Sequence, residues 1–357
     1  MGARGGDAPA TFLGATACAS SGCHGGGGVK QSQFLTWSLK DFHSQRPPAT
    51  LTAARSKQIA EALEIKDPTT DARCTSCHAP LHEVTDQVRG GNFKITEGVS
   101  CESCHGPAEN WLRAHTRKDY TSADRTAAGM RDLQNLYVRA NTCVACHQVV
   151  AQPLLKAGHP ELIFELDGQS VAEPKHWSAE KNGNSAQAWI IGQAVALREM
   201  SWQLAHEPLP DEKLKDRWLA LYWLLDTARN GVGLIKSDLV PAAAATLENT
   251  PLIQRQSDAD AKYYSGLVWS GELTGKALTA LAGSAVSFRD VTVSQPLQAR
   301  RAERLVLALD RLAAAQNSHA GDAELNQLFK LAQSVPDFEP KEFADALDKF
   351  AAAVNSP

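Results

Sequence analysis

The chain has 357 residues, of which 43% are hydrophobic and 21% charged, and its formal net charge is -4 at pH 7. These are the values of a globular protein, and the length predicts about two domains. The charge offers no basic surface for nucleic acid, and no apolar run approaches the roughly 20 residues of a membrane span. We therefore expect neither nucleic acid as a partner nor a transmembrane segment.

All eight cysteines lie in the first two fifths of the chain, in four pairs that each end in histidine. The pairs read Cys18-Ala-Ser-Ser-Gly-Cys23-His24, Cys74-Thr-Ser-Cys77-His78, Cys101-Glu-Ser-Cys104-His105 and Cys143-Val-Ala-Cys146-His147. With 11 histidines in the whole chain, this repetition is not a coincidence of composition. In the first motif, four residues separate the cysteines, which requires a looped backbone that Ser21-Gly22 can supply.

Cys-x-x-Cys-His is the attachment signature of covalent haem. Two thiols about one helical turn apart reach the two vinyl groups on one porphyrin edge, and the next residue supplies an axial imidazole to the iron. Disulfides, zinc sites built from paired cysteines, or a redox-active dithiol are the alternatives. None of them requires histidine after every second cysteine, so the sequence predicts four covalently bound haem c groups.

Seven histidines remain for the opposite side of the irons, whereas the methionines Met130 and Met200 fit ordinary packing better. His43 ends an amphipathic stretch over 29–42 that Pro47-Pro48 is expected to stop. His115 follows the third motif by ten residues. His159 and His176 lie beside proline or an aromatic residue. We therefore predict bis-histidine ligation, with His43, His115, His159 and His176 as the second ligands.

The other three histidines are predicted not to bind iron. His82 is four residues after His78, so on a helix both side chains would project to the same side and could not take opposite faces of one iron. His206 precedes a proline at the end of a helical segment, and His319 lies in a polar stretch. We expect both to be surface residues.

Residues 98–115 read Gly98-Val-Ser-Cys101-Glu-Ser-Cys104-His105-Gly106-Pro107 and continue to His115. This resembles the tetrahaem cytochrome c-554 family, which has a similar Gly-Val-x-Cys-x-x-Cys-His-Gly-Pro stretch with a distal histidine shortly after it. The segment with Gln33, Trp37 and His43 is similar to that family's tryptophan-containing helix and its distal histidine. The similarity covers about residues 14–176 and departs at the first motif, where the family usually has two residues between the cysteines.

The resemblance implies a mostly helical domain with closely stacked porphyrin pairs and little sheet. It implies that His115 ligates the haem of His24, that His43 ligates the haem of His147, and that His159 or His176 ligates the haem of His105. In the best-known members the second haem lacks a distal ligand. Because this chain offers both His159 and His176, we expect the haem of His78 to be closed as well.

The cysteine-free second half is rich in helical patterns. Apolar stripes occur over 188–204, with Trp189 and Trp202, over 217–228, and at Phe343, Leu347, Phe350 and Val354. We predict a mainly α protein, with an N-terminal tail over 1–13, a tetrahaem domain over 14–180 and a helical bundle over 185–357. The stripes are expected to form the core of that bundle, and Lys181-Asn-Gly-Asn-Ser is linker-like.

A fully ligated iron holds no substrate, so the sequence predicts electron transfer, with no catalytic residue and no enzymatic activity. Expected partners are other cytochromes, or a quinol-linked or outer-membrane electron-transfer complex. One alternative is an oxidoreductase with an open haem at His78 that acts on a nitrogen oxide or hydroxylamine, and another is a haem subunit of an extracellular conduit. Covalent haem is attached after export, so we expect a periplasmic or extracellular protein, although residues 1–6 lack the features of a leader and read as a trimmed start.

Overall fold

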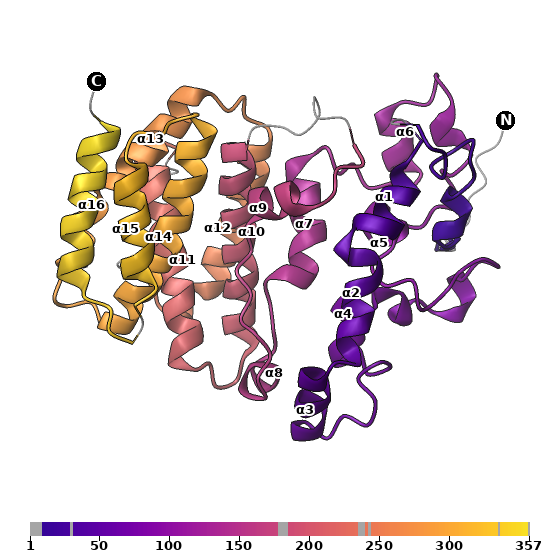
Figure 1. Ribbon diagram of the computed structural model, residues 1–357, viewed down its shortest axis with the longest axis horizontal. Coiled ribbons are helices and arrows are strands. Elements are labelled where there is room, and N and C mark those ends of the chain that lie inside the picture. The colour runs from indigo at the N-terminus through magenta and orange to yellow at the C-terminus, as the bar shows by residue number, and fades with distance from the viewer. Residues whose placement is uncertain are drawn as a thin grey trace. The chain divides into compact units, whose positions relative to one another are not determined.

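The protein is described here by a computed structural model that covers residues 9–28, 31–177, 185–234, 240–241, 244–334 and 336–355. It is 64% helical, and among the described residues the single β-bridge joins Phe12 and Arg89. The prediction of a mainly α protein is confirmed. The chain divides into two compact units, Met1–Ile163 with Gln169–Asn182, and Phe164–Gly168 with Gly183–Pro357 (Figure 1). The linker-like residues 181–184 lie outside the described ranges.

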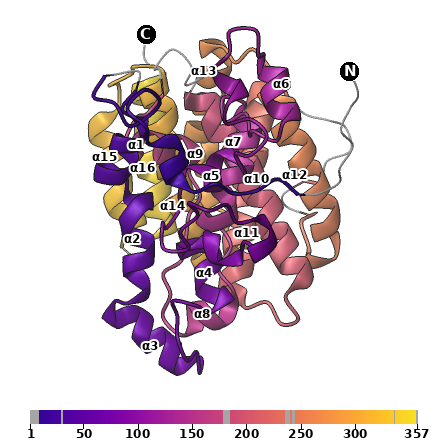
Figure 2. The ribbon, with the colours of Figure 1, turned by 90° about the vertical axis from the view of Figure 1, so that its right-hand side faces the viewer.

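The N-terminal unit is built from short helices joined by turns. They are α1 (Gln33–Lys40), α2 (Phe42–Leu51), α3 (Ala54–Ala62), α4 (Ala72–His78), α5 (Cys101–His105), α6 (Ser122–Ala127), α7 (Leu136–His147) and α8 (Gln152–Lys156). In Figure 2, α2 and then α3 follow one another along the indigo part of the ribbon. A ninth helix, α9 (Leu166–Ala172), has residues in both units.

The predicted helix over 29–42 is corrected by the structure. α1 ends at Lys40, and Asp41 has an extended backbone with ψ of 129°. The Asp41 carboxylate accepts the backbone N–H of His43 at 2.9 Å and so caps a new helix, α2. His43 therefore lies in the first turn of α2 and does not follow the end of a helix.

The prediction that Pro47-Pro48 stops the helix is also wrong, because both prolines lie inside α2. A proline in a helix removes an N–H donor and leaves the carbonyl four residues earlier without its partner. For Pro47 that carbonyl belongs to His43, and it accepts the N–H of Val99 at 3.0 Å. A bond from a distant segment thus replaces the lost helical bond, which is information that the local pattern does not contain.

A buried carboxylate joins the start of the chain to the third cysteine motif. Glu102 is 1% exposed and accepts hydrogen bonds from the backbone N–H groups of Leu13 at 2.9 Å, Gly14 at 2.7 Å and Ala108 at 2.7 Å. Gly14 is four residues before Cys18, so Glu102 ties the segment that leads into the first motif to the third motif. Residues 9–13 of the predicted tail are described, and residues 1–8 are not.

The N-terminal unit has few large apolar side chains in its interior. Trp111 is the one buried aromatic residue among those described there, and much of the remaining buried apolar surface comes from alanine, valine, leucine and isoleucine. The four motif histidines and six of the eight motif cysteines are half-buried, whereas Cys18 is buried and Cys23 is exposed. This interior fits a bulky apolar group held by sulfur and imidazole better than it fits a core of packed side chains.

The C-terminal unit is a bundle of seven longer helices together with the N-terminal part of α9. The seven are α10 (Ser185–His206), α11 (Glu212–Val232), α12 (Thr250–Ser265), α13 (Gly271–Ala282), α14 (Gln295–Ala315), α15 (Asp322–Ala332) and α16 (Pro340–Val354). α10 packs on α12, α11 packs on α13 and α14, and α15 packs on α16 (Figure 1). None of the described helices is both long enough and apolar enough to cross a membrane.

Most large apolar residues of the predicted stripes are buried in the core of this bundle, to which α12, α13, α14 and α15 also contribute buried residues. The buried members of the stripes include Trp189, Trp218, Tyr222, Phe343, Leu347 and Phe350. The prediction is wrong for Trp202, which is 44% exposed and stacks on His206 with ring centres 4.6 Å apart. Trp202 lies about 220° around the helix from Trp189, so the two side chains cannot share a face.

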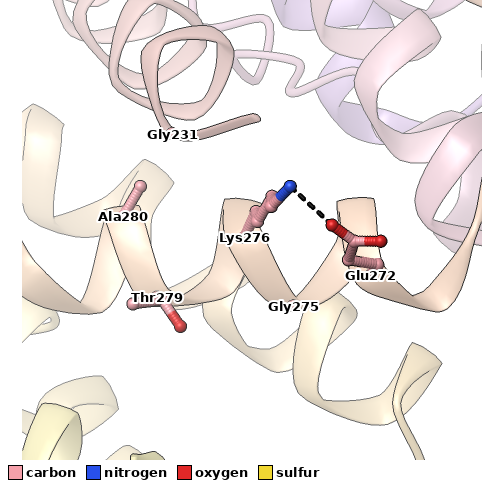
Figure 3. A pocket seen from close by; sticks show the side chains of 6 residues that line it. All are labelled: Gly231, Glu272, Gly275, Lys276, Thr279 and Ala280. Carbon is pink, nitrogen blue, oxygen red and sulfur yellow. Dashed lines mark ion pairs between the residues drawn. The ribbon is translucent and has the colours of Figure 1, made fainter. Parts of the chain in front are cut away.

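A hollow beside α13 belongs to the same unit and is lined by Gly231, Glu272, Gly275, Lys276, Thr279 and Ala280 (Figure 3). Gly231 allows α11 and α13 to approach closely, because a Cβ there would lie 2.2 Å from the Cβ of Ala280. Lys276 and Glu272 form an ion pair on the rim. The lining contains no cysteine and no histidine, so this hollow is separate from the predicted haem sites.

Candidate functional site

Three of the four motifs form the last turn of a helix. α4, α5 and α7 end at His78, His105 and His147, each of which directly follows its second cysteine. Polar caps start these helices, since Asp71 accepts the N–H of Arg73 at the head of α4 and Asn135 accepts two N–H groups at the head of α7. The helical turn brings both thiols and the imidazole of a motif to one end of the helix.

The first motif has a different backbone, but a turn still brings His24 close to its first cysteine. A 3-10 helix over Ala15–Cys18 is followed by a turn in which the N–H of His24 donates to the carbonyl of Cys18 at 3.2 Å. The close backbone approach occurs at Gly25, where a Cβ would lie 1.9 Å from the carbonyl oxygen of Ala19. No atom lies within 4 Å of a Cβ built on Gly22. Ser21 and Gly22 lie in this turn, as predicted, and the closest backbone approach is at Gly25.

Each motif histidine faces one of the four histidines predicted as second ligands. The distances between ring centres are 6.1 Å for His24 and His115, 6.0 Å for His43 and His147, 6.3 Å for His78 and His159, and 6.5 Å for His105 and His176. A metal–imidazole bond is about 2.0–2.1 Å long, and the ring centre lies about 1.1 Å beyond the nitrogen. Two imidazoles on opposite sides of one metal ion would thus have centres about 6.3 Å apart. All four pairs fit a six-coordinate iron.

The Nδ1 atoms of the paired histidines face groups of the protein. Side chains face three of them: Gln33 lies 3.0 Å from His24, Asp41 lies 3.0 Å from His43, and Gln169 lies 3.2 Å from His147. Backbone carbonyls face three more: Leu112 for His115, Pro160 for His159 and Pro174 for His176. The His78 ring is hydrogen-bonded to the backbone of Pro47. A proton on Nδ1 donated in this way leaves Nε2 free for a metal ion.

Two buried polar atoms at these histidines have no hydrogen-bond partner among the described residues. In His105, Nδ1 is buried and has no hydrogen-bond partner among the described residues. In Gln169, Nε2 faces His147 while Oε1 is buried without a partner. Turning the amide by 180° would present Oε1 to a protonated Nδ1, and this orientation agrees with ligation of His147 through Nε2.

Burial favours the uncharged form of several motif groups. It lowers the pKa of His105 to about 4, and it also lowers the pKa of His78 and of His147. Neutral imidazole is the form that binds a metal ion. Burial raises the pKa of the Cys104 thiol to about 12, so that group is protonated at neutral pH. In contrast, the hydrogen bond to Asp41 raises the pKa of His43.

The cysteines lie next to each other across motifs. The neighbouring Cys101 side chain lowers the pKa of the Cys18 thiol, and the neighbouring Cys146 side chain lowers the pKa of the Cys77 thiol. All eight cysteines are free. Within the described part of the chain, the single group of three possible metal ligands is Asp41, His43 and Glu173, which contains no sulfur. The contacts therefore join the first motif to the third and the second to the fourth, and they do not assemble a zinc site.

The sequence matches one family model. Residues 17–106 match the family described as cytochrome c554 and c-prime. The matched segment contains the first three motifs and His43. It indicates a c-type cytochrome with covalently bound haem c and a role in electron transfer. The chain matches none of the curated proteins and none of the solved structures with which it was compared.

The cytochrome c554 match ends before the fourth motif and before His115, His159 and His176. For these residues the histidine geometry is the evidence. The structure pairs His78 with His159 and not with His82, which lies in a short 3-10 helix over Pro80–Glu83. His206 stacks on Trp202, and His319 is largely exposed beside Asp322.

Three residues that contact the paired histidines were not identified from the sequence. Gln33 and Asp41 are close to their partners in the chain, and the Asp41–His43 spacing is that of a helix cap, which was a usable signal. Gln169 is 22 residues after His147 and carries no local signal.

Proposed function

We propose that this chain is a tetrahaem c-type cytochrome that transfers electrons, with both axial positions of every iron occupied by histidine. The observation that carries the proposal is the set of four histidine pairs with ring centres 6.0 to 6.5 Å apart. Four pairs at the spacing required by one metal ion, each containing one motif histidine, are not expected from packing alone.

The residues have distinct tasks in this proposal. Cys18, Cys23, Cys74, Cys77, Cys101, Cys104, Cys143 and Cys146 would attach four haem c groups, and the paired histidines would hold the irons. Haem iron supplies the redox chemistry by changing between its ferric and ferrous states. Where a group faces Nδ1, it would orient the imidazole and keep its proton on that atom, as the partners of metal-bound histidines commonly do.

The position of His159 bears on whether one haem is open to a substrate. Its ring lies opposite His78 at 6.3 Å, within the range of the other three pairs. The Nδ1 of His159 is 2.8 Å from the carbonyl of Pro160, which leaves Nε2 for the metal ion. This arrangement supports electron transfer over the alternative in which the haem of His78 acts on a nitrogen oxide or hydroxylamine.

The contacts between cysteines support a relay of several electrons. Cys18 lies beside Cys101 and Cys77 lies beside Cys146, so attachment points are neighbours in two pairs. We propose that a tetrahaem domain over 14–180 precedes a helical domain over 185–357. The partners would be other cytochromes or a quinol-linked or outer-membrane complex, in the periplasm or outside the cell, where covalent haem proteins mature.

Mass spectrometry of the denatured protein tests the haem count and should give the mass of the polypeptide plus four haems. Electron paramagnetic resonance then tests the ligation. All ferric irons should be low spin, with two kinds of spectrum, because the rings of His24 and His115 are 22° from parallel whereas those of His43 and His147 are at 87°. A nearly parallel pair gives a rhombic signal, and a perpendicular pair gives one strongly anisotropic low-field feature. High-spin iron in one quarter of the haems would contradict the bis-histidine assignment.

A further inference from the structure

The partner of Nδ1 is not the same for all paired histidines. His43 alone has a carboxylate as its hydrogen-bond partner, since Oδ1 of Asp41 lies 3.0 Å from Nδ1. For the others the partner is a neutral amide or carbonyl, except for His105, which has none among the described residues. His176 has a carboxylate nearby, in Glu173 at 3.9 Å, but the carbonyl of Pro174 is closer, at 3.3 Å.

Asp41 is also held rigidly. It is 7% exposed, and the same Oδ1 accepts the backbone N–H of His43 at 2.9 Å as the cap of α2. The Asp41 end of the bond to Nδ1 is therefore shielded from water, while the His43 side chain is 34% exposed. A hydrogen bond to a charged group is stronger where water is excluded. Glu173 contributes a second carboxylate, because the ligand atoms of Asp41, His43 and Glu173 all lie within 4.8 Å of one another.

A carboxylate that accepts the Nδ1 proton makes the imidazole a more strongly donating ligand. A more strongly donating axial ligand stabilises the ferric over the ferrous state. We propose that Asp41 is a positioning residue that lowers the reduction potential of the haem of His147 through its hydrogen bond to His43. This inference rests on the proposed function, because it requires His43 and His147 to be the two ligands of one iron.

The variant Asp41→Asn tests the inference with little disturbance of the fold. Asparagine is as good a helix cap as aspartate and still offers an oxygen to Nδ1, so the substitution removes mainly the charge. The assay is a mediated spectroelectrochemical titration of the tetrahaem protein. One of the four one-electron steps should move to a more positive potential, and a tenfold change in the ferric-to-ferrous preference corresponds to about 59 mV. The haem count and the low-spin spectrum should not change.

Two further variants serve as matched controls. Gln33→Glu places a carboxylate 3.0 Å from Nδ1 of His24 and should lower a different step. Asp119→Asn removes the same charge as Asp41→Asn, but from an exposed residue paired with Arg117 that contacts none of the paired histidines. This variant should leave all four reduction potentials unchanged.

Unchanged potentials in Asp41→Asn, with four low-spin haems still present, would overturn the inference. An equal displacement of all four steps, or the same displacement in Asp119→Asn, would also overturn it, because the effect would then be one of net charge. If Asp41→Asn does not mature, Gln33→Glu decides, and the absence of a negative displacement counts against the inference. Wild-type protein without four low-spin irons would instead refute the proposed function, and this is seen before any variant is compared.

Discussion

Replacement of Glu102 by alanine should destabilise the N-terminal unit more than any exposed carboxylate does. The side chain is 1% exposed and accepts three backbone N–H groups, from Leu13, Gly14 and Ala108, at 2.7 to 2.9 Å. Each buried donor left without a partner costs about 1–3 kcal/mol. The chain can relax and water can enter, so the three costs do not simply add. We expect the free energy of unfolding to fall by about 3–5 kcal/mol, the range for removing one partner of a buried charged contact.

The assay is guanidinium unfolding of the haem-loaded protein, followed by haem absorbance so that the N-terminal unit is observed. Glu109→Ala is the control, since the exposed Glu109 accepts a single N–H, from Thr11 at 2.7 Å, and its loss should cost less than about 1 kcal/mol. Glu102→Gln should lie between the two, because the amide retains one acceptor oxygen. A loss in Glu102→Ala no larger than that in Glu109→Ala would show that the three bonds do not join the first and third motifs.

Three further outcomes are expected. His159→Ala should leave four haems attached but convert one iron to high spin that binds carbon monoxide when reduced, whereas His206→Ala should change neither property. Gly231→Ala should destabilise the C-terminal unit by about 1–3 kcal/mol in thermal unfolding, since its Cβ would meet that of Ala280 at 2.2 Å. Burial raises the pKa of Glu165 to about 7, so the folded state holds this proton more tightly than the unfolded state. The stability that Glu165 contributes should be fully present below about pH 4.5 and be lost as the pH rises to about 7. Glu165→Gln should remove this part of the pH dependence of the unfolding free energy. If the dependence between about pH 4.5 and 7 is unchanged in the variant, it does not come from Glu165.

The sequence was most informative where the chemistry is local. A cysteine motif fixes two thiols and an imidazole within one turn, so His78, His105 and His147 could be named as candidates without knowledge of the fold. The apolar stripes were equally local, and they failed at Trp202 because a list of aromatic residues does not state on which side of the helix each one lies.

Features that depend on contacts between distant segments could not be predicted from the sequence. The sequence left open whether His159 or His176 faces His105, and the structure places His176 there and His159 opposite His78. Pro47 remains inside a helix because Val99 supplies the missing donor from 52 positions away. No pattern of the kind used here encodes such a pairing.

The scarcity of large buried side chains in the N-terminal unit has a consequence for how the protein is made. Trp111 is its one buried aromatic residue among those described, whereas the C-terminal unit buries Trp189, Trp218 and Phe343. The newly made chain would thus contain a bundle able to fold at once and, ahead of it, a segment with too few apolar contacts to fold by itself. Such a segment stays extended and open to the enzymes that form thioethers. Ligation would then drive its collapse, and a protease added before haem attachment should digest this half while sparing the other.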